Sequence, residues 1–236
     1  PMTLSEEVQA ELTKQTTRMA LAMKVRGLIN IQFAIEGKNI FILEVNPRGS
    51  RTVPFASKAR GISFAKIAMK VMLGRKLKEF KLPVMPKNLV YVKEAVFPFQ
   101  RFSNTDIILG PEMRSTGEVM GLDMNFGRAF AKSQLGAGSK VPVEGVVFVS
   151  VKDQDKQAMV KPVKRLVELG FKVVATRGTS VFLGKHGIET QEVNKVLQGR
   201  PHIVDLMKDG KVHLVFNTVD GAGALTDSFT LRRTAL

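Results

Sequence analysis

Two alternating apolar runs, separated by a short polar stretch, most constrain the fold of this 236-residue chain. The runs cover residues 28–35 and 40–46, and the Gly37-Lys38-Asn39 stretch between them is typical of a tight turn. We therefore predict an antiparallel hairpin with a three-residue turn. The alternation places one wholly apolar set on a predicted core face, consisting of Ile29, Ile31, Phe33, Ile35, Phe41, Leu43 and Val45.

The opposite face of the predicted hairpin is polar, with Gln32 opposite Glu44 and with Asn46 beside them. Amide and carboxylate oxygens are ligands for a hard divalent cation. Arg48 and Arg51 follow at once and carry planar guanidinium groups that bind phosphate or carboxylate oxygens. A half-exposed hairpin with a solvated polar face is the alternative. The two arginines favour a site for a nucleoside triphosphate with its metal.

Longer stretches around this hairpin resemble the ATP-grasp domain of carbamoyl-phosphate synthetase large subunits. The resemblance covers nearly all of the chain. The sequence of residues 51–55 is similar to that of the second ATP-grasp half of the family, which phosphorylates carbamate. The stretches that carry it are Gly27-Leu28-Ile29-Asn30-Ile31-Gln32, Glu44-Val45-Asn46-Pro47-Arg48, Arg51-Thr52-Val53-Pro54-Phe55, Ser57-Lys58-Ala59 and Gly110-Pro111-Glu112-Met113-Arg114-Ser115-Thr116-Gly117-Glu118.

The resemblance implies an ATP-dependent ligase that forms carbamoyl phosphate for pyrimidine and arginine synthesis. It implies ATP with two Mg²⁺ or Mn²⁺ ions, held by Gln32, Glu44 and Asn46, and K⁺ is a further candidate ion. Arg48 and Arg51 would be the catalytic residues. The implied partners are a glutamine amidotransferase small subunit and the remainder of the large subunit. We expect the chain to be a C-terminal fragment that is inactive alone.

The last third of the chain alternates strand-like and helix-like segments, which predicts a parallel sheet covered on both faces. A glycine- and proline-containing stretch before it suggests two domains, residues 1–141 and 142–236. We thus expect a mixed α/β and α+β chain, a partial ATP-grasp lobe followed by a Rossmann-like parallel-sheet domain that is incomplete at its C-terminus. Pro162 falls inside the predicted helix 156–169 and predicts a kink or a late helix start.

A second candidate site follows the predicted strand 171–176. Free amides at a helix start, two hydroxyls and Gly178 form an anion cradle at residues 176–180. Lys156 and Lys195 could add positive charge, and Asn217 ends a strand where open α/β sheets bind ligands. The alternative is a helix capped by Thr179 with solvated lysines. The joint placement of these residues at strand ends favours a phosphate pocket.

The same region resembles the methylglyoxal-synthase-like domain, which in carbamoyl-phosphate synthetases binds a nucleotide monophosphate effector. The positions that match the effector site are Lys156, Thr176, Thr179, Lys195 and Asn217. Val219 replaces a hydroxyl residue of the family, and Glu94 matches a position that contacts ornithine in some members. The resemblance also suggests an oligomer formed through this domain.

Two alternatives stay open for the function. The chain could be a stand-alone regulatory module that binds a nucleoside monophosphate, with the hairpin as a remnant. It could also be a methylglyoxal synthase, which needs a catalytic aspartate, and Asp153 and Asp155 are the candidates.

Composition argues against several other classes of protein. The net charge of +15 fits phosphate ligands, but the basic residues are scattered and the chain has one tyrosine and no tryptophan, so we expect no nucleic-acid binding. No apolar run approaches the ~20 residues of a membrane span, and the N-terminus lacks a signal-peptide pattern. The absence of cysteine fits the cytoplasm.

Overall fold

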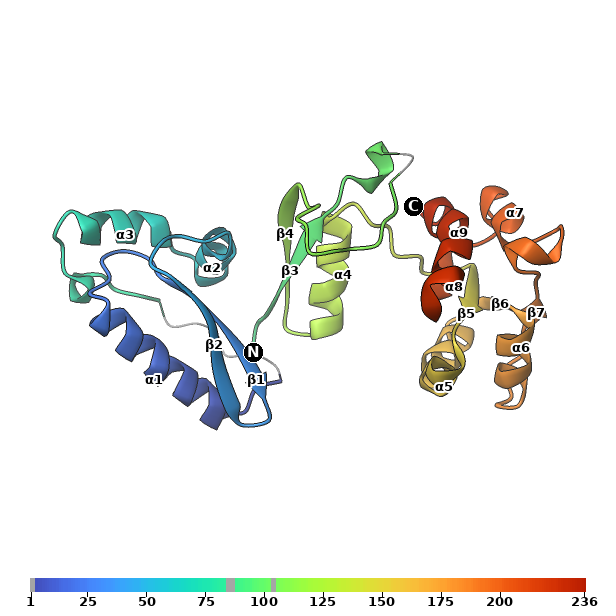
Figure 1. The fold of residues 1–236 in the computed structure, drawn as a ribbon, viewed down its shortest axis with the longest axis horizontal. Helices are drawn as coiled ribbons and strands as arrows, with labels where there is room; N and C mark the ends of the chain where they lie inside the picture. The colour runs from blue at the N-terminus through green and yellow to red at the C-terminus, as the bar shows by residue number, and fades with distance from the viewer. Residues whose placement is uncertain (1–2, 84–87, 103–104) are drawn as a thin grey trace. The chain divides into compact units, whose positions relative to one another are not determined.

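The structure is a computed structural model that describes residues 3–83, 88–102 and 105–236 (Figure 1). It contains two compact units, each described by itself below. The first comprises Pro1–Lys93 with Leu122–Ala129, and the second comprises Glu94–Gly121 with Phe130–Leu236.

The first unit is built from two capped helices around a hairpin, followed by short helical turns. Ser5 caps the first helix because its hydroxyl accepts a hydrogen bond from the Val8 amide at 3.3 Å. Ser63 caps a later helix by accepting from the Lys66 amide at 3.2 Å. The elements are α1 (Glu6–Ala22), β1 (Asn30–Glu36), β2 (Asn39–Asn46), α2 (Thr52–Arg60), α3 (Phe64–Met72) and η1 (Leu77–Glu79).

The hairpin confirms the predicted pairing of Gln32 with Glu44 but corrects the turn. Glu36 pairs with Asn39, so the turn has two residues rather than three, and Gly37 takes a φ of 60° in it. A register shift follows Gln32, because Phe33 pairs with Ile42 and Leu43 is left over. A β-bulge of this kind absorbs the one-residue difference between the two ends of the hairpin.

The prediction that the apolar hairpin face lies on a core is wrong for β2. Phe41 is 50% exposed and Leu43 is 66% exposed. The register shift also changes the predicted faces, because Phe41 pairs with Ala34 and Ile42 pairs with Phe33; Ile42, now on the face of Phe33, is 49% exposed. The sequence pattern therefore identified apolar residues that the described residues of the first unit leave exposed.

Two further strands and a helix follow along the chain. The strands β3 (Val90–Val96) and β4 (Gly117–Asp123) form a two-stranded sheet. Between them the chain forms the helical turn η2 (Phe99–Arg101), and after them comes α4 (Phe126–Gly136).

The second unit contains the parallel sheet that the sequence predicted, with the strand order β7-β6-β5-β8. The predicted late helix start is wrong: α5 begins before Lys156, and Pro162 lies in its interior. The carboxylates of Asp153 and Asp155 in the first turn interact favourably with the helix dipole. This stabilisation helps to offset the hydrogen bond that Pro162 cannot donate. The strands are β5 (Val146–Ser150), β6 (Lys172–Ala175), β7 (Gln191–Glu192) and β8 (Leu214–Asn217), and the helices are α5 (Asp153–Glu168), α6 (Arg177–Gly184), η3 (Val196–Gln198), α7 (Ile203–Lys208), α8 (Gly221–Asp227) and α9 (Phe229–Thr234).

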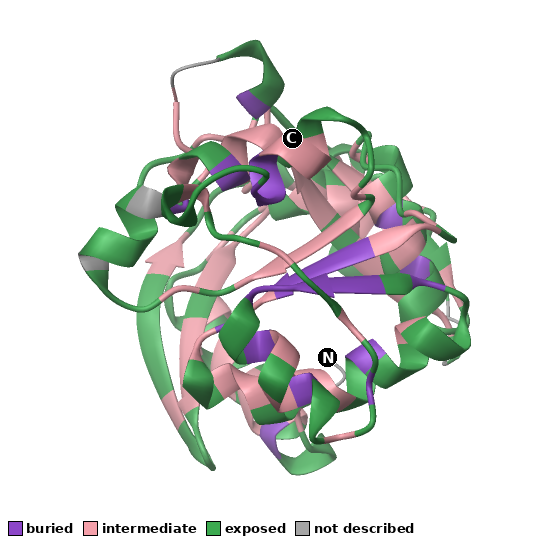
Figure 2. Cartoon of the chain, turned by 90° about the vertical axis from the view of Figure 1, so that its right-hand side faces the viewer, coloured by how far each residue is buried: buried purple, intermediate pink, exposed green. Residues whose placement is uncertain are grey.

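Hydrophobic clusters cover both faces of this sheet, and the buried strands are purple in Figure 2. Successive residues of β5 alternate between them: Val147 and Val149 join one cluster and Phe148 the other, all with no exposed surface. One cluster contains Val163, Phe171, Val173 and Leu183, and the other contains Val174, Ile203, Val204 and Leu231.

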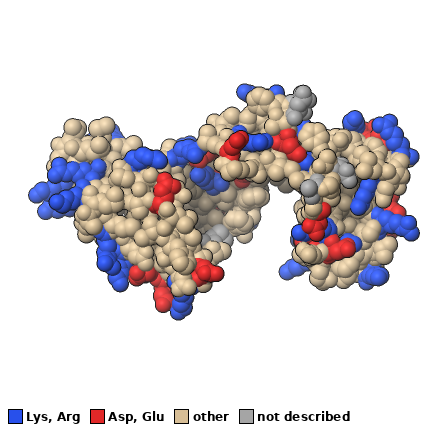
Figure 3. Space-filling model, viewed as in Figure 1, with Lys and Arg blue, Asp and Glu red and all other residues tan. Residues whose placement is uncertain are grey.

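Charged side chains are distributed over the surface rather than gathered. On the face drawn in Figure 3, Lys and Arg form several separate groups with Asp and Glu between them. Among the described residues, no helix combines the length and the apolar character that crossing a bilayer would require.

Candidate functional sites

The polar face of the hairpin gathers the three predicted metal ligands. Gln32 donates from Nε2 to Glu44 Oε2 at 3.2 Å, and Asn46 donates from Nδ2 to the other oxygen, Oε1. Both amide groups thus turn their nitrogens toward the carboxylate, so their carbonyl oxygens remain available as acceptors. The alternation of β1 and β2 creates this arrangement, because all three residues lie on the side of the bulge away from the turn, where the two strands pair regularly.

These three residues fit part of a divalent-metal site. They supply oxygen donors, which Mg²⁺ prefers, but only one negative charge. Within the described ranges, no group of three or more His, Cys, Asp or Glu side chains is placed to hold a metal ion. An ion here would take its remaining ligands from phosphate oxygens and water, as Mg²⁺ does in nucleotide sites.

The two predicted catalytic arginines lie at the junction between β2 and α2. Arg48 donates from a terminal nitrogen to the Gly49 carbonyl at 3.1 Å. Arg51 occupies the position before the first residue of α2, and both arginines are exposed. Their catalytic roles stay a prediction.

The second unit contains a cavity of about 660 Å³ at the carboxyl ends of β5, β6 and β8. This is the edge at which open parallel sheets bind ligands. The structure brings together all five residues predicted for the effector site, since the lining includes Lys156, Thr176, Thr179, Lys195 and Asn217.

The two threonines shape the cavity and are almost fully buried. Thr176 donates from Oγ1 to the Ser150 hydroxyl at 3.2 Å, and Thr179 Oγ1 accepts from the Val151 amide at 3.4 Å. Thr176 is the N-cap residue of α6, so the alternative of a cap at Thr179 is wrong. The first backbone hydrogen bond of α6 runs from the Thr179 amide to the Thr176 carbonyl at 2.9 Å, so the amides of Arg177 and Gly178 precede the helical ladder, and Gly178 lines the cavity.

Lys156 brings positive charge to the same point. Its side chain is only 15% exposed, and its Nζ lies 2.6 Å from Asp153 Oδ1. Gly178 lies beside it, and a β-carbon at that position would lie 3.4 Å from the ammonium, an ordinary contact distance. The hydrogen bond from Lys156 holds the pKa of the Asp153 carboxyl below its usual range. The ammonium and the start of α6 together form an anion-binding corner.

Several cavity residues were missed by the sequence prediction. Ser150 ends β5 as Asn217 ends β8, and that signal could have identified it; Thr218, which the sequence reasoning placed with Asn217 at the end of a strand but left out of the effector set, directly follows β8. Thr218 Oγ1 accepts from the Lys152 amide at 3.0 Å. Ser228 also lines the cavity but follows no strand, so only the packing of α8 and α9 reveals it. Val219 presents an apolar side chain to the cavity.

Glu94, the possible ornithine ligand, lies on β3 away from the cavity lining. Its Oε2 accepts a hydrogen bond from the hydroxyl of the fully buried Ser133 at 3.3 Å. This contact gives Glu94 a structural partner, and its contact with ornithine stays a prediction.

Comparisons with known proteins match part of each unit to a known family. Residues 1–80 match the family described as "Carbamoyl-phosphate synthase L chain, ATP binding domain", and residues 158–236 match the "MGS-like domain" family. The chain is 52% identical over 240 residues to the carbamoyl phosphate synthase large chain of Brucella suis biovar 1 (strain 1330), covering 99% of this chain and 21% of that protein.

Other large chains are equally similar. Identity is 53% over 237 residues with the carbamoyl phosphate synthase large chain of Myxococcus xanthus (strain DK1622), covering 100% of this chain and 22% of that protein. It is 51% over 239 residues with that of Pasteurella multocida (strain Pm70), again covering 100% and 22%. The chain therefore spans about a fifth of the length of the curated relatives it matches.

Proposed function

Because the chain belongs to the family of carbamoyl phosphate synthase large chains, we propose that its second unit binds a regulatory nucleoside monophosphate and that its hairpin forms part of the ATP site. The observation that carries the first half is the anion-binding corner inside a nucleotide-sized cavity. A phosphate group would accept from the first amides of α6 and from Lys156. Lys195 and Asn217 line the same cavity and would contact the sugar or the base.

The hairpin half of the proposal concerns the transfer of the γ-phosphoryl group of ATP to carbamate. A carbamate oxygen forms a bond to the γ-phosphorus, and the bond from that phosphorus to the β–γ bridging oxygen breaks, which releases ADP. Arg48 and Arg51 would stabilise the charge on the transferring group or on carbamate. Gln32, Glu44 and Asn46 would hold Mg²⁺ or Mn²⁺, which neutralises the phosphate charge; K⁺ is a further candidate ion.

The proposed partners follow from the same reasoning. The exposed apolar side chains of Phe41 and Leu43 need a cover, and the chain is only a fifth as long as its relatives, so we assign that cover to the remainder of the large chain. A glutamine amidotransferase subunit would supply ammonia for carbamate formation. We place the enzyme in the cytoplasm, in pyrimidine and arginine synthesis, and expect any oligomer to form through the MGS-like domain.

Calorimetric titration of the chain with uridine monophosphate and with inosine monophosphate tests the pocket. We expect saturable binding of at least one of them, weakened about 30-fold by Lys156→Gln, since a hydrogen bond to a charged group contributes about 2 kcal/mol. Lys211→Gln is the matched control, because Lys211 pairs with Asp209 and does not line the cavity. The absence of saturable binding at millimolar ligand would refute the proposed site.

One observation keeps the methylglyoxal synthase alternative testable: Asp153 lines the cavity, as a catalytic aspartate would need to. Its carboxylate is ion-paired with Lys156 and 92% exposed, which suits a surface charge better than a base shielded from water. We expect no consumption of dihydroxyacetone phosphate by the chain, and measurable conversion to methylglyoxal would reverse that assignment.

A further inference from the structure

Helix α9 faces the cavity on one side and a distant segment of the second unit on the other. Leu231 lines the cavity and is 6% exposed, and Ser228 at the junction of α8 and α9 lines it too. The next two residues, Arg232 and Arg233, do not line the cavity. Their guanidinium groups donate hydrogen bonds to residues that lie more than a hundred positions earlier in the chain.

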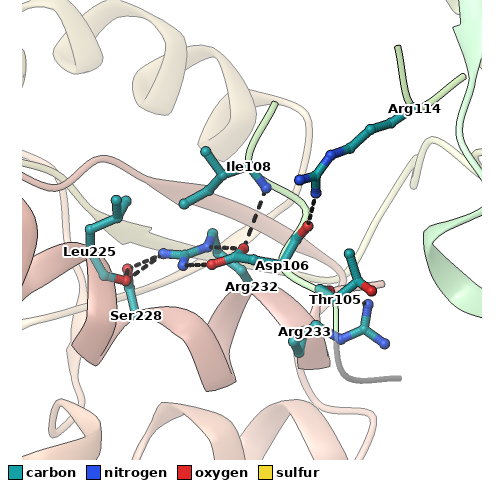
Figure 4. Close-up of polar contacts among 8 residues, drawn as sticks. All are labelled: Thr105, Asp106, Ile108, Arg114, Leu225, Ser228, Arg232 and Arg233. Carbon is teal, nitrogen blue, oxygen red and sulfur yellow. Dashed lines mark hydrogen bonds and ion pairs between the residues drawn. The ribbon is translucent and has the colours of Figure 1, made fainter. Parts of the chain in front are cut away.

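The central contact is a two-pronged ion pair between Arg232 and Asp106 (Figure 4). Arg232 donates from Nε to Asp106 Oδ1 at 3.0 Å and from its second terminal nitrogen to Oδ2. The side chains are 13% and 30% exposed, respectively. A planar guanidinium paired in this way with a carboxylate fixes both distance and orientation.

The remaining nitrogen of Arg232 ties this pair to the wall of the cavity. It donates to the Leu225 carbonyl at 2.8 Å and to the Ser228 hydroxyl. The same guanidinium thus bonds Asp106 on one side and the α8–α9 junction on the other. The hydrogen bonds from Arg232 also hold the pKa of the Asp106 carboxyl below its usual range, so the pair is charged at neutral pH.

Two other arginines hold the segment that carries Asp106. Arg233 donates to the carbonyls of Phe99 and Thr105, both at 3.2 Å, and Arg114 donates to the Asp106 carbonyl at 3.1 Å. In the described part of residues 99–114, the only helical element is the turn η2, so side-chain contacts rather than a backbone ladder fix much of this segment.

We propose that the Asp106–Arg232 pair is a positioning contact that holds the α8–α9 wall of the cavity, so that ligand binding there is coupled to the order of residues 105–109. This inference rests on the proposed nucleoside monophosphate site. Loss of Asp106 would leave Arg232 charged and largely buried without its carboxylate, bonded only to the Leu225 carbonyl and the Ser228 hydroxyl, so the orientation of the guanidinium against the cavity wall would no longer be fixed from both sides. By thermodynamic reciprocity, a ligand that contacts the wall stabilises the segment as much as the segment stabilises binding.

The proposal also means that one wall of the cavity is held by a residue outside the MGS-like match. That match begins at residue 158, and Asp106 lies well before it. A ligand in the cavity would therefore influence a segment that joins β3 to β4.

The test is calorimetric titration of Asp106→Asn in the whole chain with uridine and inosine monophosphates. The variant keeps the shape of the side chain and removes its charge, and we expect affinity to fall about tenfold, within the usual range of coupling between sites. Asp106→Glu should recover part of the loss. Asp209→Asn is the matched control, because Asp209 forms an exposed pair with Lys211 and does not line the cavity.

A second measurement needs no variant. Adding whichever of the two nucleotides binds should slow hydrogen exchange at the amides of residues 105–109 in the unmodified chain. The exchange rate at the hairpin turn around Gly37 should not change. Normal binding by Asp106→Asn, or no added protection of residues 105–109, would overturn the coupling and leave the nucleotide site intact. If neither nucleotide binds the unmodified chain, the proposed function and this inference both fail.

Discussion

The hairpin site and the cavity of the second unit are both built from polar residues at strand ends, but they differ in what lies beneath them. In β5, Val147, Phe148 and Val149 have no exposed surface, and a cluster covers each face of the sheet. In β2, Phe41 and Leu43 are at least half exposed. The cavity therefore rests on a buried core, whereas the hairpin site rests partly on β2, whose apolar side chains the described residues leave exposed.

The difference in packing matches a difference in chemistry. The cavity has a positive corner formed by Lys156 and α6, enclosed by residues from several elements. The hairpin offers one carboxylate, Glu44, with two amides, and its arginines are exposed. This contrast supports the proposals that the cavity binds its ligand with residues of this chain and that the hairpin contributes one side of the ATP site.

The largest expected effect compares the same substitution in both regions. Phe148→Ala should lower the free energy of unfolding by about 4 kcal/mol, because it empties a fully buried position. Phe41→Ala should lower it by less than about 1 kcal/mol, because that ring is half exposed in this chain. Urea denaturation followed by circular dichroism measures both.

Measuring the unfolding free energy of Phe41→Ala in a full-length large chain as well tests whether the rest of that protein covers the hairpin. If the remainder of that protein covers the hairpin, the cost there should exceed the cost in this chain. Equal costs in the two proteins would show that nothing covers Phe41.

Substitution of Gly145, just before β5, should have the next largest effect on stability. This glycine has a φ of 119°, and a β-carbon on it would lie 2.6 Å from the ring of His213. His213 cannot move freely, because its Nδ1 accepts from the Val146 amide at 3.1 Å. Gly145→Ala should therefore cost about 3 kcal/mol, from the clash together with backbone strain.

Gly170 provides the matched control for this prediction. Its φ of 94° is also left-handed, but nothing lies within 4 Å of a β-carbon placed there. Gly170→Ala should cost only the strain, about 1 kcal/mol. Thermal melting of both variants separates the two causes, and equal melting temperatures would remove the clash with His213 from the explanation.

The hairpin site is tested by Arg51→Ala in the full-length enzyme. We expect carbamate-dependent ATP turnover to fall about 100-fold or more, because removal of one donor to a developing charge has an effect of this size. Arg60→Ala, at the other end of α2, is the control and should retain activity. Full turnover by Arg51→Ala would refute the catalytic role of Arg51.

Local pattern was enough to predict the parts of the fold that short-range rules determine. The alternation of residues 28–46 fixed the pairing of Gln32 with Glu44, and the alternation of strands and helices after residue 146 predicted the parallel sheet. The bulge at Leu43 escaped prediction, because one additional residue preserves the alternation on either side of it.

Contacts between distant segments were beyond the reach of that pattern. Alternation indicates which side of β2 is apolar, but it does not indicate whether another segment covers Phe41. Asp106 and Arg232 are 126 positions apart, and no spacing rule relates them. The five predicted cavity residues fared better, because each lies near the end of a strand or near the start of a helical segment at the same edge of one sheet.

The smallest expected effect concerns the charge balance of the cavity itself. Asp153 places a carboxylate 2.6 Å from Lys156 Nζ, where it competes with an anionic ligand for the same ammonium. Asp153→Asn should therefore raise the affinity for uridine or inosine monophosphate, by only about threefold because water screens so exposed a pair. Asp155→Asn is the control, since Asp155 lies in the same first turn of α5 but does not line the cavity. Lower affinity in Asp153→Asn would instead mean that the carboxylate holds Lys156 in position for binding.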